Sequence, residues 1–433
     1  MTETSDPAPP TAAAEPAVTR AALWRRFAAD VTPLRESADY RRWWIGIVVS
    51  FTGTQLTQVA LPLQVYAITK SSVAVGLIGA VVLVPFVLSG LIGGAVADAV
   101  DRRRLTLLTG SALTVVSALL AVQAALGLRQ LWLLYVLAAV QGAFASVDSA
   151  ARGAMLPRLV RREMLPSANA LGQLGFNGAM TVGPLLAGLL VAAVGFTWTF
   201  ALDAASFAAI LCALWRLPAM PPEGGSTRAG LRSVAEGLRF LGPRKNLLMT
   251  FLVDINAMVF GMPRALFPAV GVHWFHGGAS TVGLLYAAPP LGAFLGAALS
   301  GWSARVRRQG LAVLVSVSLW GGAIAAFGLS RTLWLSLLFL AVAGAADMVS
   351  AVFRNTILQV ATPDSLRGRL QGVFIVVVAG GPRLGDVESG TVAGAFGLGT
   401  SVVSGGLACI AGVAALAAAY PSFAKYDARQ PVP

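Results

Sequence analysis

Charged side chains inside long apolar stretches are the residues of this sequence best placed to do chemistry. An ionisable group at the centre of a membrane-spanning helix costs about 2.5–3.5 kcal/mol, so each one needs a partner or a watery cavity. Asp148 and Arg152 stand four residues apart in one apolar stretch, so a helix places them on one face as an ion pair. Arg354, with Asp347 two turns earlier, stands in a second stretch and predicts another intramembrane ion pair.

Four further acids lie in apolar stretches and have a second candidate role. Asp203 and Asp254 stand in two separate stretches, and a third contains Asp386 and Glu388. Arg383 lies three residues before Asp386, which favours local pairing, whereas Glu388 has no obvious local partner. Each of these four carboxylates is a candidate for binding and releasing protons, and ion pairing across a helix bundle is the alternative.

The elements that must position these charges are membrane-spanning helices. The 433 residues are 56% hydrophobic and 12% charged, whereas a soluble domain carries about 25% charged residues. A helix needs roughly 20 apolar residues to cross the hydrocarbon, and it satisfies its own backbone hydrogen bonds there. About twelve stretches qualify, near 43–67, 73–97, 104–127, 131–155, 167–193, 196–217, 247–271, 280–303, 310–329, 333–357, 370–393 and 397–419. The sequence therefore predicts an all-α integral membrane protein.

The distribution of positive charge predicts the orientation. Of 32 Lys and Arg residues, only Lys70, Arg129 and Arg331 lie in loops on one side, and four more lie inside spans. The others fall on the opposite side, which the positive-inside rule makes cytoplasmic. We therefore expect a multi-pass protein of the cytoplasmic membrane with both termini inside. The same distribution explains the net charge of +13 without a nucleic-acid partner.

An internal repeat predicts the architecture. Residues 131–156 reappear without a gap at 333–358, so that Arg152 corresponds to Arg354 at an offset of 202. Such a duplication indicates two parallel six-helix bundles. The predicted organisation is a tail at 1–40, bundles at 41–217 and 246–420, a cytoplasmic linker at 218–245, and a tail at 421–433.

Two local motifs carry a resemblance to a known family. Gly94, Asp98, Arg102 and Arg103 stand at and just after the end of the second apolar stretch, and Gly183-Pro184 with Gly188 lies in the fifth. They resemble the loop signature and the antiporter motif of the major facilitator superfamily, in particular its enterobactin (siderophore) exporter and drug:proton antiporter branches. The resemblance implies that the Asp and Arg side chains bind the other half when the cytoplasmic side is shut. It also implies a helix kink at Pro184.

The resemblance further implies secondary active transport by alternating access. We expect proton-driven export of a small amphiphilic molecule, either a siderophore-like metabolite or a drug, by a monomer in the lipid bilayer. No cofactor is expected, and His273 and His276 alone make a poor metal site. An alternative is a transferase that uses Asp98 and Asp101 to hold magnesium and a lipid diphosphate, although the second half has no matching acidic motif.

Overall fold

The computed structural model describes residues 30–221, 239–362 and 364–427, and omits some side chains in α4, η3 and α14. The first half contains α2 (Thr32–Glu36), α3 (Ala38–Thr69), α4 (Ser72–Ala99), α5 (Arg102–Ala125), α6 (Leu131–Leu159), η1 (Arg162–Met164) and α7 (Leu165–Trp215). The second half contains α9 (Lys245–Phe260), η2 (Arg264–Leu266), α10 (Phe267–His273), α11 (Ala279–Ala298), η3 (Ser300–Arg305), α12 (Gln309–Leu329), α13 (Leu333–Ala361), α14 (Asp364–Phe396), α15 (Leu398–Ala419) and α16 (Pro421–Ala424).

The described helices are consistent with the twelve predicted spans. Ten of them are long and apolar enough to cross a membrane. One of the ten includes α7, which joins two helices across non-helical Gly195 and so supplies two spans. α14 is not among the ten but is 33 residues long, which exceeds the length that a span requires.

Two glycines make equivalent turns in the two halves. Gly195 has φ 79° within α7, and Gly397 has φ 89° between α14 and α15. Glycine adopts these positive φ values at no steric cost, so the backbone can turn sharply at each of the two glycines. The two positions are 202 residues apart, which is the offset of the sequence repeat. The duplication therefore extends to the turn between the last helices of each half.

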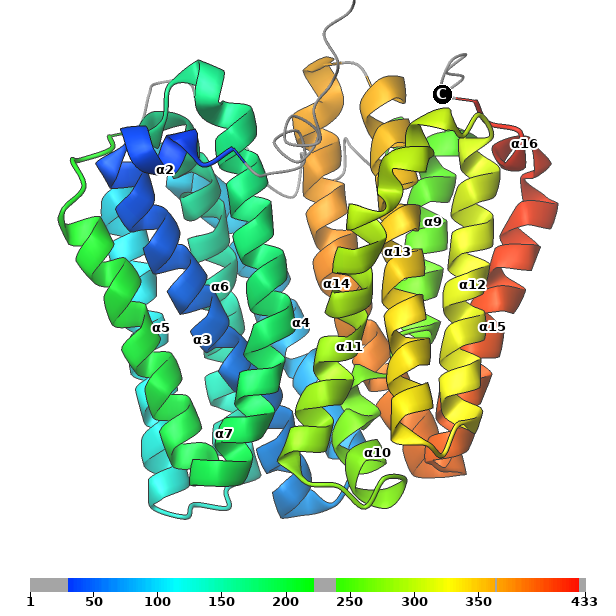
Figure 1. Ribbon diagram of the computed structural model, residues 1–433, viewed down its shortest axis with the longest axis horizontal. Helices are drawn as coiled ribbons and strands as arrows, with labels where there is room; N and C mark the ends of the chain where they lie inside the picture. Colours follow the sequence, from blue (N-terminus) through cyan, green and yellow to red (C-terminus); the bar gives the residue numbers. More distant parts are fainter. Residues whose placement is uncertain (1–29, 222–238, 363, 428–433) are drawn as a thin grey trace, which may run out of the picture.

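The helices form two bundles that meet along two pairs of helices. In Figure 1, α3–α7 form one group and α9–α15 the other. α4 packs against α14, and α7 packs against α11. Both ends of the described chain lie on the same side of the molecule, at the top of Figure 1, which we call the termini end; the other side is the opposite end.

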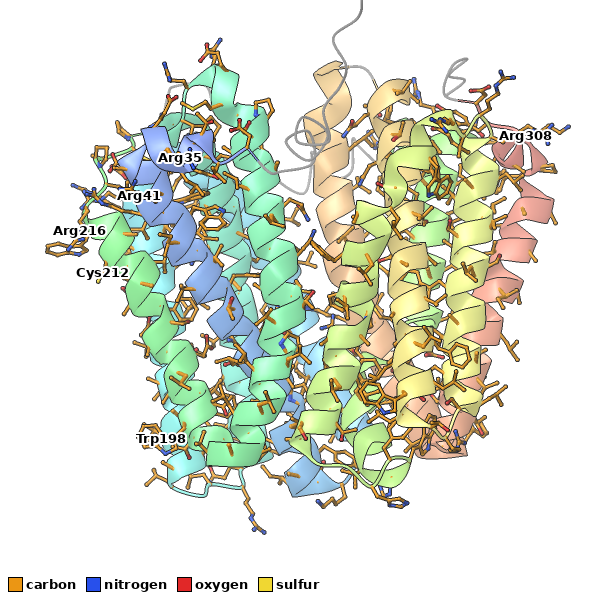
Figure 2. The ribbon with its side chains drawn as sticks, in the orientation of Figure 1. Arg35, Arg41, Trp198, Cys212, Arg216 and Arg308 are labelled. Atoms are coloured by element: carbon orange, nitrogen blue, oxygen red, sulfur yellow. The ribbon has the colours of Figure 1, made fainter. Side chains whose placement is uncertain are left out.

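The outer surface has the composition of a lipid-facing surface. Large apolar side chains are exposed along the helices, including Trp215 (76%) and Leu329 (72%). Figure 2 shows Arg35, Arg41 and Arg308 at the termini end, as the charge distribution predicts. A helix surface that is apolar between charged ends fits a bilayer and not water.

Candidate functional site

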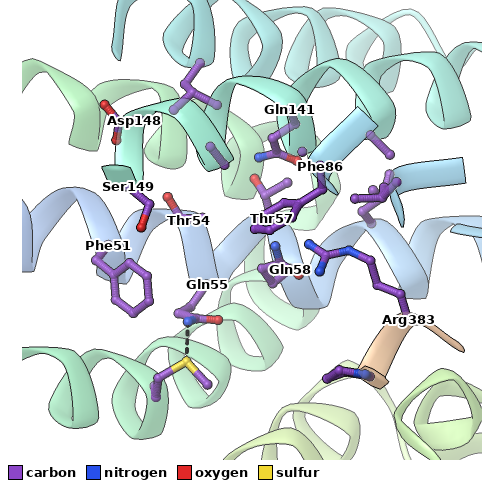
Figure 3. Close-up of a pocket in the computed structure, with 18 of the residues that line it drawn as sticks. Phe51, Thr54, Gln55, Thr57, Gln58, Phe86, Gln141, Asp148, Ser149 and Arg383 are labelled. Atoms are coloured by element: carbon purple, nitrogen blue, oxygen red, sulfur yellow. Dashed lines mark hydrogen bonds between the residues drawn. The ribbon is translucent and has the colours of Figure 1, made fainter. Parts of the chain in front are cut away.

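A cavity with a volume of about 660 Å³ lies between the two bundles. Helices α3, α4, α5, α6 and α7 line it from the first half, and η2, α11 and α14 line it from the second. Its aromatic wall includes Phe51, Phe86 and Phe176, and Figure 3 shows Phe51 and Phe86 among polar side chains. Its polar and charged residues include Gln55, Gln58, Gln141, Asp148, Ser149, Arg152, Asn169, Arg264, Arg383 and Asp386. The lining is amphiphilic.

A smaller cavity of about 280 Å³ adjoins the first and extends into the second half. The two cavities share lining residues, among them Gln58, Phe176 and Arg264. The smaller one continues to Trp320 on α12 and Asp347 on α13. Asp347 thus has access to the central space, and its side chain is 36% exposed.

The seventh span is broken where it lines these cavities. The sequence predicts one helix over 247–271, but α9 ends at Phe260 and the short η2 turn precedes α10. Such irregular backbone is tolerated at membrane depth only when it is buried in protein or lines a cavity. Neighbouring helices satisfy its polar groups: Trp320 donates to the Gly261 carbonyl at 2.9 Å, and the Tyr286 hydroxyl donates to the Arg264 carbonyl at 3.0 Å.

The first half contains one compact ion pair in the cavity wall. Arg152 Nε lies 2.5 Å from Asp148 Oδ2 on the same helix, α6. The Thr109 hydroxyl donates to the other oxygen of Asp148 at 2.7 Å. The structure thus brings together the pair that the sequence spacing suggests, and it satisfies both carboxylate oxygens.

In the second half, Arg354 lies between two acids. It forms an ion pair with Asp254 on α9 and lies 3.4 Å from Asp347 on its own helix. Both side chains of the Arg354–Asp254 pair are nearly buried. Asp254, a candidate for proton binding from the sequence, is therefore part of a cluster in which two carboxylates share one guanidinium.

The other candidate acids lie in three different environments. Asp203 is fully buried and accepts hydrogen bonds from the hydroxyls of Thr57 (2.5 Å) and Ser117 (2.8 Å). Asp386 lines the larger cavity and accepts a hydrogen bond from the backbone N–H of Ala265 at 3.1 Å. Glu388 is partly buried and lines neither cavity.

Comparison with known proteins identifies the family. A family model described as "transmembrane secretion effector" matches residues 28–431. The chain belongs to this family of major facilitator transporters. It is 32% identical over 358 residues to enterobactin exporter EntS of Citrobacter koseri, an alignment that covers 81% of this chain and 84% of that protein. The corresponding Shigella boydii protein has the same identity and coverage.

Solved structures agree with this assignment at the level of the fold. A mutant of the nucleoside transporter NupG superposes with a TM-score of 0.70 at 14% identity, covering 89% of this chain and 99% of that one. A bacterial homologue of the lysosomal transporter Spinster, in an inward-facing and unoccupied conformation, gives 0.67 at 16% identity, covering 90% and 96%. These likenesses show that the chain has the fold of these transporters.

The described arginines of the loop signature contact their own half. Arg102 donates to the Ala154 carbonyl at 3.0 Å, and Arg103 donates to the carbonyls of Leu214 (2.8 Å) and Trp215 (2.9 Å). Cations at helix C-termini stabilise the unpaired carbonyls there. The surroundings of Gly94 and the side chain of Asp98 are outside what the structure describes, so the expected contact with the other half stays a prediction.

The antiporter-like motif of the family member lies at helix crossings. A Cβ at Gly183 would collide with Gln55 of α3, within the first half. A Cβ at Gly188 would lie 2.9 Å from the Cα of Gly283 on α11, in the second half. Small residues at these positions let the backbones approach closely. Pro184 lies between them inside α7, and its carbonyl also faces Gly283.

Proposed function

We propose that this chain exports a small amphiphilic molecule, siderophore-like in character, from the cytoplasm across the cytoplasmic membrane as a proton-coupled monomer. The observation that carries the proposal is the cavity that both bundles line with charged, amide and aromatic groups. Its mixed lining suits a molecule that has both aromatic and polar parts. The similarity to enterobactin exporters over 81% of the chain supports a siderophore-like cargo.

The state of the molecule fits an exporter that awaits cargo from the cytoplasm. We assign the termini end to the cytoplasm because the arginines gather there. The described contacts between the halves lie toward the opposite end: Tyr66 bonds His273 at 2.8 Å, and Gly188 packs on Gly283. The cavity would then open inward, and rocking of one bundle against the other would expose it outside.

Proton coupling would act through the Arg354 cluster. Two carboxylates, Asp254 and Asp347, share one guanidinium, so the cluster carries one excess negative charge when both are ionised. A proton on Asp347, which is accessible from the smaller cavity, would remove that excess without breaking the Asp254 pair. At 100 mV, one charge crossing the membrane supplies about 2.3 kcal/mol, enough for about a fiftyfold gradient of cargo.

The transport assay uses purified protein in vesicles whose interior is more acidic than the medium. We expect enterobactin to accumulate inside only when the pH gradient is present. Asp347→Asn should abolish accumulation because the cluster no longer carries a charge that a proton can remove. Asp39→Asn, an exposed acid paired with Arg42, is the matched control and should behave as wild type. Enterobactin accumulation that does not depend on the pH gradient, or that continues in Asp347→Asn, would contradict this coupling.

Two alternatives are distinguished by simple observations. The aromatic wall also suits planar drugs, and drug efflux predicts that ethidium accumulates in the same vesicles while enterobactin does not. The transferase is disfavoured because backbone N–H groups already bind both carboxylate oxygens of Asp101. Its Oδ1 accepts from the N–H groups of Arg103 (2.9 Å) and Arg104 (3.2 Å), and its Oδ2 accepts from that of Met220 (3.1 Å).

A further inference from the structure

Two arginines of the second half converge on one carboxylate at the wall of the larger cavity. Arg264 comes from the η2 turn and Arg383 from α14, and both line the cavity together with Asp386. Asp386 follows Arg383 by three residues on α14, and it accepts a hydrogen bond from the backbone N–H of Ala265, the residue next to Arg264, so both arginines flank this carboxylate. The described residues that line the cavity include three arginines and two carboxylates, and one of these carboxylates, Asp148, pairs with Arg152 at 2.5 Å. The lining around Asp386 is therefore rich in positive charge.

The surrounding structure holds this imbalance in place. Tyr286 donates to the carbonyl of Arg264, and Asp386 accepts from the N–H of Ala265, so the broken turn is tied to α11 and α14. The guanidinium carbon of Arg383 lies 4.0 Å from the centre of the Phe86 ring across the interface between the halves. Two positive side chains held near one another where water is scarce raise the free energy of the protein, and a bound anion between them lowers it.

The neighbourhood of the pair favours a particular kind of anion. Figure 3 shows Arg383 pointing from α14 toward the part of the cavity where Gln58 and Phe86 lie. Phe176 and Tyr286 also line the space. Guanidinium groups bind planar carboxylates and similar oxyanions through paired hydrogen bonds, and they stack on aromatic rings. An aromatic molecule with one delocalised negative group would satisfy both the charge and the rings.

We propose that Arg264 and Arg383 form an anion subsite that binds the carboxylate or phenolate group of an aromatic cargo. This inference rests on the proposed export function, whose substrate class it narrows. Asp386 is a positioning residue in this subsite: it holds the turn and keeps the two arginines together. An inside-negative membrane potential would itself favour the outward movement of such an anion.

The first test compares three probes of one shape and different charge. Binding of naphthoate, neutral naphthamide and cationic naphthylmethylammonium is measured on the purified full chain in detergent, without any gradient, by probe fluorescence. We expect naphthoate to bind about tenfold or more tightly than naphthamide, and the cation to bind weakest, because a charge-assisted contact adds about this factor. Equal binding of naphthoate and naphthamide by the wild type would overturn the proposal.

The second test changes the charge of the subsite in both directions. Arg264→Gln and Arg383→Gln should each reduce the preference for naphthoate over naphthamide about tenfold, whereas Arg264→Lys and Arg383→Lys should retain part of it. Asp386→Asn should increase the preference, because the amide oxygen can still accept from Ala265 while the negative charge is lost. Arg331→Gln is the control, since Arg331 also stacks on an aromatic ring, Trp274 at 4.2 Å, but lies outside both cavities.

The two proposals fail in different ways. If the arginine variants shift the preference no more than Arg331→Gln does, the subsite is wrong, whatever the vesicle assay shows. If the preference behaves as expected but no gradient-driven accumulation occurs, proton-coupled export is wrong and the subsite stands. The probe comparison uses wild-type protein and needs no variant. It can therefore refute the proposal even if a variant folds poorly.

Discussion

At the scale of single residues, the two equivalent arginines of the repeat use different partners. Arg152 pairs with Asp148 on its own helix, whereas Arg354 pairs with Asp254 on α9 and approaches Asp347. The first pair is electrically balanced, and the second cluster carries one carboxylate in excess. Asp347, which we propose as the proton-binding group, therefore lies in the second half, beside the smaller cavity.

The shared guanidinium predicts an unusual order of mutational effects. Arg354→Met should destabilise by about 3 kcal/mol or more, because it leaves the buried carboxylate of Asp254 without a cation. Asp254→Asn should cost clearly less, because Arg354 keeps Asp347. The double variant Arg354→Met with Asp254→Asn should be more stable than Arg354→Met alone. Thermal unfolding of the purified variants in detergent checks this order, and additive losses in the double variant would contradict it.

At the scale of elements, the fold depends on one broken helix and on close helix crossings. The break between α9 and α10 presents Arg264 to the cavity, and Trp320 and Tyr286 satisfy the exposed carbonyls. The crossing of α7 and α11 brings Gly188 and Gly283 into contact between the halves. The break between α9 and α10 therefore positions Arg264 in the cavity wall, and the crossing of α7 and α11 holds the two halves together toward the opposite end.

A larger side chain at the crossing should open the opposite end. In Gly188→Val the added atoms would collide with the Ala279 carbonyl, 2.7 Å from the Cβ position, and with Gly283. We expect slower transport and faster labelling, from the opposite side, of a cysteine placed at Gln58 in a background that lacks Cys212 and Cys409. Gly178→Val is the control on the same helix, because nothing lies within 4 Å of its Cβ position. Equal labelling in both variants would refute this role.

At the scale of the whole molecule, the described contacts between the bundles lie toward the opposite end, and the arginines gather at the termini end. In Figure 1 the bundles approach each other toward the lower part of the view. Alternating access requires that this state be one of two arrangements of nearly rigid halves. The cavity should therefore be reachable from one membrane face at a time.

Accessibility of single cysteines checks both the state and the orientation. Ser149 is exposed and lines the larger cavity, so Ser149→Cys should react with a membrane-impermeant maleimide mainly in inside-out vesicles. Arg129→Cys, in an exposed loop at the opposite end, should react mainly in right-side-out vesicles. Both variants carry replacements of Cys212 and Cys409. Reversal of the two patterns would overturn the assigned orientation, and labelling of Ser149→Cys from outside alone would overturn the assigned state.

The sequence by itself determined the architecture. Hydropathy, the positions of Lys and Arg, and the offset of 202 residues are properties of the chain read in order, and lipid selects for them directly. The turns at Gly195 and Gly397 agree with that repeat. The spacing of Asp148 and Arg152 suggested their pairing because both lie on one helix, where geometry is set locally.

Only the tertiary structure decided which distant charges meet. Arg354 pairs with Asp254, which lies 100 residues earlier in the chain. Arg264 and Arg383 line the same cavity because α9 and the η2 turn pack against α14. The sequence carried one signal for the break, the Gly261-Met262-Pro263 segment just before Arg264. Which faces of two helices meet depends on their rotation and crossing, and nearly uniform apolar helices do not encode these in their hydropathy.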